Sequence, residues 1–236
     1  MSEERLDEEG RGLLRQIVEA QGYRQLMAGN IRGFGIQFLP ALEDKLRFTR
    51  ELEHTLVVMR ELERFYRDLD GGSLNEAARP RLDRIPYPDS RLELAACLAL
   101  TGRAERAAAA SYLDCSHRDF AAVAHTLAEA QHAVVEAEER LFVEYCAEPG
   151  HRPQAQQYWN RWFTLCLLSL GRPGTTRDQR AVELRLRSKR VDEVVRLFFE
   201  DAEPLRRACS LEPPLIDRLR VELPEDLRGR VAFHEV

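Results

Sequence analysis

Two segments of this sequence carry a glutamate three residues before a histidine. The first step is Glu51 and His54, and the second is Glu129 and His132. Residues three apart lie on one face of a helix, so each step presents a carboxylate and an imidazole in the same direction. Both groups bind iron and manganese, and facing helices in carboxylate bundles combine such steps around a metal pair. The spacing therefore predicts a metal site built from these four residues.

The helical spacing of apolar residues predicts the elements that position these steps. The range 41–69 carries the first step, and the range 119–145 carries the second. Two further helices complete a four-helix core: 13–28, ended by the following glycines, and 91–113, capped by Ser90. We expect a single all-α domain over residues 1–236, with the core bundle at about 11–148 and additional helices and a tail at about 153–236. The expected additional helices are 154–170 and one long charged helix, 177–208.

Composition narrows the class of protein. The chain has 236 residues, of which 44% are hydrophobic and 32% charged, which suits one domain of amphipathic helices. A net charge of -5 gives no general attraction to nucleic acid, and no apolar run approaches the roughly 18 residues of a membrane span. The charged N-terminus is unlike an export signal, and the five scattered cysteines are typical of reduced thiols. We therefore expect a cytoplasmic protein without nucleic-acid or membrane partners.

Several patterns have a plain structural alternative. In a chain with 40 acidic residues, a glutamate three positions before a histidine arises readily, so each step also fits an exposed pair. The acidic cluster of Glu136, Glu138 and Glu139 is most simply interpreted as a solvated face. The basic stretch 177–190 fits a solvated face, an acidic partner subunit or a phosphorylated cofactor such as coenzyme A.

The layout resembles the ferritin-like family that includes the catalytic subunit of phenylacetyl-CoA epoxidase and its non-catalytic partner. The segments that carry this resemblance are Leu13–Ile17, Arg50–His54, the Tyr87-Pro88 turn, Glu129–His132 and Trp159–Trp162. The resemblance implies a ferritin-like four-helix bundle. It also implies that the two Glu-x-x-His steps are ligands of an oxygen-activating di-iron centre; one iron ion, or manganese, is the alternative content.

The sequence departs from the family pattern at two places. The acid of the family's first helix falls near Arg24 or Gln25, and that of its third helix falls near Leu100. Neither an arginine nor a leucine ligates iron. The site is therefore rebuilt with other acids, holds one metal ion, or holds none. The acids one or two turns away are Glu19, Glu93 and Glu105.

Two functions stay open at this point. In the first, the chain is a metal-binding oxidoreductase of the di-iron monooxygenase type, which takes electrons from a partner reductase and acts on an organic substrate such as a coenzyme A thioester. In the second, it is a non-catalytic scaffold or regulatory subunit of such an oxygenase, with a degenerate metal site. Retention of both Glu-x-x-His steps favours the first function, and loss of the other two acids favours the second. Expected partners are a second copy of the chain or an oxygenase or reductase subunit.

Overall fold

The computed structural model describes residues 6–217 and 220–233, except the side chains of residues 130–133. This part of the chain is all-α, as the sequence predicts, and its two short strands pair in parallel. In chain order the elements are α1 (Glu8–Gly35), the 3-10 helix η1 (Ile36–Phe38), α2 (Leu42–Asp68), α3 (Leu74–Leu82), α4 (Arg91–Ala109), α5 (Arg118–Cys146), α6 (Arg152–Leu170), α7 (Thr176–Glu183), α8 (Val191–Ala208), β1 (Leu215–Ile216), the 3-10 helix η2 (Glu225–Arg230) and β2 (Ala232–Phe233).

Local side-chain chemistry sets where the long helices begin and end. The Asp7 carboxylate accepts a hydrogen bond of 2.7 Å from the Gly10 amide and so caps α1. At the start of α4, the Ser90 hydroxyl accepts from the Glu93 amide at 3.1 Å, and the Glu93 carboxylate accepts from the Asp89 amide at 2.9 Å. After α2, Asp70 takes a positive φ of 58°, which turns the chain away from the helix axis.

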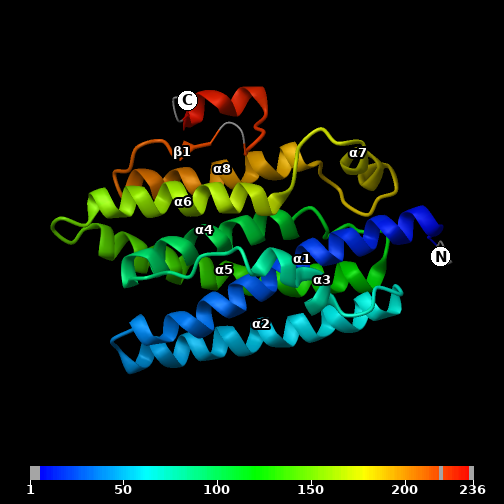
Figure 1. Cartoon of the computed structure of the whole chain (residues 1–236), viewed down its shortest axis with the longest axis horizontal. Coiled ribbons are helices and arrows are strands. Elements are labelled where there is room, and N and C mark those ends of the chain that lie inside the picture. The colour runs from blue at the N-terminus through cyan, green and yellow to red at the C-terminus, as the bar shows by residue number, and fades with distance from the viewer. Residues whose placement is uncertain (1–5, 218–219, 234–236) are drawn as a thin grey trace.

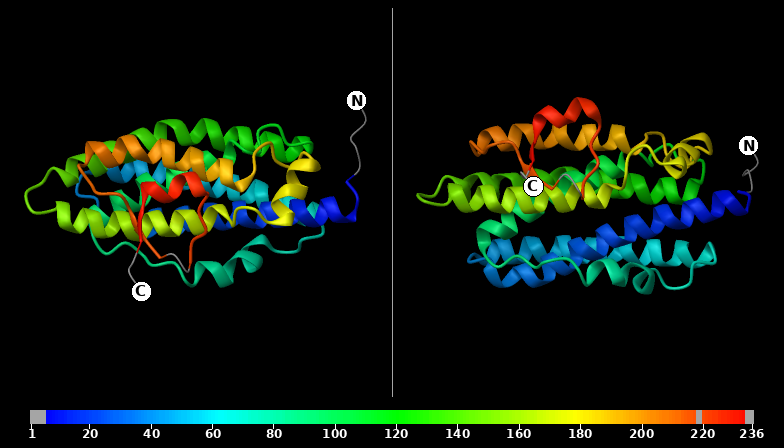
Figure 2. Two further views of the ribbon diagram at one scale, coloured as in Figure 1. Left: turned by 90° about the horizontal axis from the view of Figure 1, so that it is seen from above. Right: turned by 45° about the horizontal axis from the view of Figure 1, so that its top comes forward.

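The long helices lie along one another in three layers (Figure 1). In this view α1 and α2 form one layer, α4 and α5 the middle layer, and α6 and α8 the third. The tilted view on the right of Figure 2 also shows α1 and α2 as the lower layer. The first two layers are helical hairpins, since α1 packs on α2 and α4 packs on α5. Contacts of α1 with α4 and of α2 with α5 join these hairpins. The two Glu-x-x-His steps lie on α2 and α5, which are therefore neighbours.

Helix α4 is the centre of the molecule. Seventeen of its nineteen residues are buried, because it contacts α1, α5, α6 and α8. Its many alanines let these neighbours approach closely. The helix also buries the charged side chains of Glu93, Arg103 and Glu105. Buried charges require partners of opposite charge or hydrogen bonds, and the surrounding helices supply them. No helix in the described ranges is long and apolar enough to cross a membrane.

Helix α1 continues through the glycines that were expected to end it. The prediction of a helix over 13–28 was too short, because α1 begins at Glu8 and continues through Gly29 and Gly33 to Gly35. A Cβ atom on Gly35 would lie 2.6 Å from Leu94, and one on Gly22 would lie 2.6 Å from Leu74. Packing against α3 and α4 offsets the conformational cost of glycine within the helix.

The charged segment expected as one helix over 177–208 is two helices. Arg185, with a positive φ of 55°, lies in the connection between α7 and α8. The Arg185 carbonyl accepts a hydrogen bond of 2.8 Å from the Ser116 amide, and the Ser188 amide donates one of 2.7 Å to the Ser111 carbonyl. These bonds anchor the connection to the turn between α4 and α5. The proline-containing connection before α4 also holds a helix that was not expected, α3.

Candidate functional site

Three of the four predicted ligands line one hollow between α2 and α5. Glu51, His54 and Glu129 all border this hollow, which has a volume of about 470 Å³. His54 and Glu129 are exposed, whereas Glu51 is only 11% exposed at its side chain. The side chain of His132 lies outside the described part of the structure. The spacing argument thus placed the first step and Glu129 correctly on neighbouring helices.

The Glu51 carboxylate is held by two arginines. Its Oε1 atom accepts a hydrogen bond of 2.9 Å from Arg47, one turn earlier on α2. Its Oε2 atom lies 3.5 Å from Nε of Arg32, which comes from α1. Both oxygens therefore face a guanidinium, the group that matches a carboxylate best in charge and shape.

Arg32 also binds a buried carboxylate on α5. Its Nη2 atom donates a hydrogen bond of 2.6 Å to Glu138, whose side chain is completely buried. Burial raises the pKa of Glu138 to about 7, although Arg32 acts in the opposite direction. Burial lowers the pKa of Arg32, but the carboxylates of Glu138 and Glu51 outweigh it and hold that pKa above its ordinary value. Arg32 thus links α1 to both helices that carry the Glu-x-x-His steps.

A second ion pair lies deeper along α1. Nε of Arg24 lies 3.3 Å from the Glu105 carboxylate of α4, and both side chains are almost inaccessible to water. Gln21 donates a hydrogen bond to Glu105 and accepts one of 2.6 Å from Arg24. Arg24 also donates to the Ser169 carbonyl of α6 at 3.0 Å. One of the three acids considered as relocated ligands, Glu105, therefore neutralises an arginine.

The other two candidate acids lie in different environments. Glu19 accepts a hydrogen bond of 2.6 Å from the Tyr66 hydroxyl, which links α1 to α2. Glu93 is fully buried at the start of α4, where its Oε1 atom accepts from Trp162 at 3.0 Å and from Arg161 at 2.8 Å. Both acids are thus engaged in joining helices.

The donors in the described part of the chain, which leaves out the His132 side chain, do not fit a di-iron centre. Three carboxylates (Glu51, Glu105 and Glu138) each lie against at least one guanidinium of Arg24, Arg32 or Arg47, so each already has a cationic partner. A metal ion bound between Glu51 and Glu138 would add positive charge beside Arg32, where repulsion is strong because water is largely excluded. Within the described residues, no group of three or more histidine, cysteine, aspartate or glutamate side chains is arranged to hold a metal ion.

Sequence reasoning missed Arg32 and misplaced Glu138. Glu138 was interpreted as part of a solvated face, yet it is 0% exposed. A signal was present, because Val135, Glu138 and Phe142 are spaced three and four residues apart, and both apolar members of this series are buried. An acid in such a series requires a cationic partner, and Arg32 similarly follows the buried Ile31 on α1.

A second hollow, which we call the arginine groove, lies between α1, α3, α6 and α7. Its volume is about 670 Å³, and its apolar lining includes Ile17 and Leu165. Four exposed arginines border it and form no ion pair with any residue in the described ranges: Arg81, Arg84, Arg177 and Arg220. The only acid among its described lining residues, Asp178, is committed to Arg187 at 3.0 Å and to the Val191 amide. The groove thus combines an apolar lining with an excess of positive charge.

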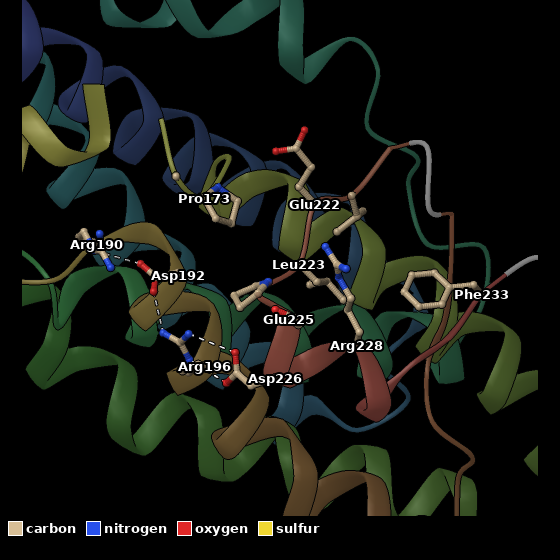
Figure 3. Close-up of a pocket in the computed structure, with 13 residues that line it drawn as sticks. Pro173, Arg190, Asp192, Arg196, Glu222, Leu223, Glu225, Asp226, Arg228 and Phe233 are labelled. Carbon is tan, nitrogen blue, oxygen red and sulfur yellow. Dashed lines mark hydrogen bonds and ion pairs between the residues drawn. The ribbon is translucent and has the colours of Figure 1, made fainter. Parts of the chain in front are cut away.

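A third hollow, of about 810 Å³, lies between the start of α8 and the C-terminal segment (Figure 3). Four of its charged side chains pair with one another. Arg196 donates hydrogen bonds of 2.9 and 3.1 Å to Asp226 and one of 2.7 Å to Asp192. Arg190 lies 3.4 Å from Asp192 on the same side of the hollow. These side chains therefore stabilise the docking of the C-terminal segment on α8.

The buried position of Glu138 predicts a specific dependence of stability on pH. Its pKa of about 7 in the folded protein exceeds the ordinary value of 4.5, so between these pH values the folded state binds a proton that the unfolded chain releases. The contribution of Glu138 to the free energy of unfolding is therefore fully present below pH 4.5 and is lost as the pH rises from 4.5 through 7. We expect the loss to reach about 3 kcal/mol, the free energy that corresponds to this pKa difference.

The measurement is urea unfolding of the wild type and of Glu138→Gln between pH 4.5 and 8. The variant cannot ionise at this position. The difference in free energy of unfolding, variant minus wild type, should therefore increase by about 3 kcal/mol between pH 4.5 and 8. Parallel pH profiles of the two proteins would show that Glu138 does not titrate in this way.

Comparison with known proteins assigns no family. The chain matches no protein-family model, and no curated protein is significantly similar to it. The resemblance to ferritin-like oxygenase subunits therefore stays a prediction from sequence pattern. Any proposal about function depends on the contacts of the side chains described above.

Proposed function

We propose that this chain is a non-catalytic helical-bundle subunit whose interior is neutralised by ion pairs rather than by metal ions. The observation that carries the proposal is Arg32. Its guanidinium lies 2.6 Å from the carboxylate of Glu138 and 3.5 Å from that of Glu51. An arginine at this position occupies the space and supplies the positive charge that a bound metal would provide between α2 and α5.

The position of the first Glu-x-x-His step supports the same proposal. Glu51 faces inward to its arginines, whereas His54 is exposed. The imidazole that metal binding would require therefore lies on the solvent side of the hollow. In this account, the retained pattern stabilises helix packing through Glu51, and the histidine contributes to the surface. The oxygenase function, with iron bound by both steps, stays the alternative prediction that metal analysis decides.

Metal analysis of the purified full chain tests the proposal. After expression in medium supplemented with iron and manganese, we expect fewer than about 0.1 ions of either metal per chain, because a second cation beside Arg32 is repelled. The double variant Glu51→Ala with His54→Ala should have the same low metal content. One or two tightly bound ions per wild-type chain, lost in the double variant, would contradict the proposal and establish the oxygenase alternative.

The arginine groove favours a second function, the binding of an amphipathic anion. Its volume of about 670 Å³ is within the range of small-ligand sites, roughly 300–1,000 Å³. The apolar wall of α1 and α6 suits a hydrocarbon body, and the exposed guanidiniums of Arg84 and Arg177 suit a phosphate or carboxylate head. A regulatory subunit with such a groove would respond to an anionic amphiphile without transforming it.

Calorimetric titration with dodecyl phosphate, kept below its micellar concentration, tests this second function. We expect saturable binding that weakens at least about tenfold in the double variant Arg84→Glu with Arg177→Glu, because two attractive charges become repulsive. Arg228→Glu is the matched control, since Arg228 is an exposed arginine on a different hollow. Equal binding of dodecyl maltoside, or unchanged affinity in the double variant, would show that the arginines recognise no anionic head.

A further inference from the structure

Exposed apolar side chains gather on the outer face of α2. The structure exposes seven large hydrophobic residues in its described part, and four of them belong to this helix: Leu42, Leu46, Leu56 and Val57. Helix α2 forms an outer edge of the molecule in both Figure 1 and the tilted view of Figure 2. Apolar residues concentrated on one exposed helix commonly mark a protein–protein contact.

The exposed residues form a regular seam along the helix. We define the α2 stripe as six residues whose spacing alternates between three and four, and all six are exposed: Glu43, Leu46, Arg50, Glu53, Val57 and Arg60. This alternation is the heptad spacing by which two helices pack side by side. The stripe spans 17 residue steps, or about 26 Å of helix, which is enough for an extended helix pair.

The charges of the stripe have no partner within the chain. Elsewhere on α2 most charged side chains pair internally, as Arg64 does with Glu61 at 2.7 Å and Arg67 with Glu63 at 2.8 Å. In contrast, the four charged residues of the stripe form no ion pair with any residue in the described ranges. All four charged residues that face outward along this line are thus without an ion-pair partner in the described ranges.

The α2 stripe is complementary to the same stripe of a second copy that runs in the opposite direction. When two copies run antiparallel about a two-fold axis between residues 51 and 52, opposite charges and apolar residues meet. The resulting pairs are Glu43 with Arg60, Leu46 with Val57, and Arg50 with Glu53, each formed twice. A shift by one heptad places Glu43 opposite Glu53 in one direction and Arg50 opposite Arg60 in the other. A parallel arrangement would place each charge against itself, so both alternatives are repulsive.

From this complementarity we infer that α2 is the interface of a homodimer, in which it packs antiparallel against α2 of a second copy of this chain. The pairing is isologous, as a two-fold dimer requires. Leu42 and Leu56 border the stripe and add apolar surface to the contact. Arg50 also lines the hollow that contains Glu51 and His54, so the second copy approaches the mouth of that hollow.

A charge exchange tests both the dimer and its register. Sedimentation equilibrium of the wild type at 1–100 µM should give twice the chain mass of 27.2 kDa. In Arg50→Glu, two glutamates oppose each other at both symmetric contacts, and in Glu53→Arg two arginines do. We expect each variant to dissociate at least about tenfold more readily than the wild type. An equimolar mixture should form a heterodimer, because the introduced glutamate of one variant then faces the introduced arginine of the other.

Matched measurements separate the interface from folding. Arg50 and Glu53 are both exposed, so circular dichroism and the thermal midpoint of each variant should match those of the wild type. Arg228→Glu, which changes the net charge as Arg50→Glu does but lies outside α2, should dimerise like the wild type. A monomeric wild type at 100 µM would overturn the proposal. A mixture of the two variants that forms no heterodimer would equally overturn it.

Discussion

The buried contact between Arg32 and Glu138 is the interaction on which the core of this protein depends. It joins α1 to α5, and through Glu51 the same arginine reaches α2, so three of the four core helices meet at one guanidinium. Removing one member of such a group leaves a charge with no partner in a dry interior, which costs far more than an exposed ion pair contributes. The three side chains therefore hold α1, α2 and α5 together at one point.

The pairing of the buried charges within the chain bears on which surfaces can bind other molecules. Because Glu51 is held by Arg32 and Arg47, one carboxylate at the hollow between α2 and α5 is already paired, whereas His54 and Glu129 at the same hollow form no ion pair with any described residue. Further unpaired charges lie around the arginine groove and along the outer face of α2. Positive charge over an apolar lining suits an amphipathic anion, and a self-complementary stripe suits a second copy. The proposed roles in ligand binding and association both use groups that the core does not require.

The helices that pack by regular apolar spacing were predictable from the sequence. Helix α2 was expected over 41–69 and runs from Leu42 to Asp68, and α5 was expected over 119–145 and runs from Arg118 to Cys146. Features determined by tertiary contacts were not predictable in this way. Helix α1 continues past Gly29 to Gly35, where Leu94 of α4 packs against the glycine, and the turn before α8 depends on hydrogen bonds to residues far away in sequence.

In the candidate site, too, local spacing was predictable from the sequence and tertiary contacts were not. Its location was predictable, since the spacing of Glu51 and His54 placed both residues at one hollow with Glu129. Its chemistry was not, because Arg32 and Glu138 are 106 positions apart and neither belongs to a metal-binding motif. The most direct test of the central claim is a double-mutant cycle at pH 8, in which unfolding is measured for Arg32→Met, Glu138→Met and the double variant. The account predicts that each single variant loses about 3 kcal/mol or more, whereas the double variant returns to within about 1 kcal/mol of the wild type. Additive losses in the double variant would contradict it.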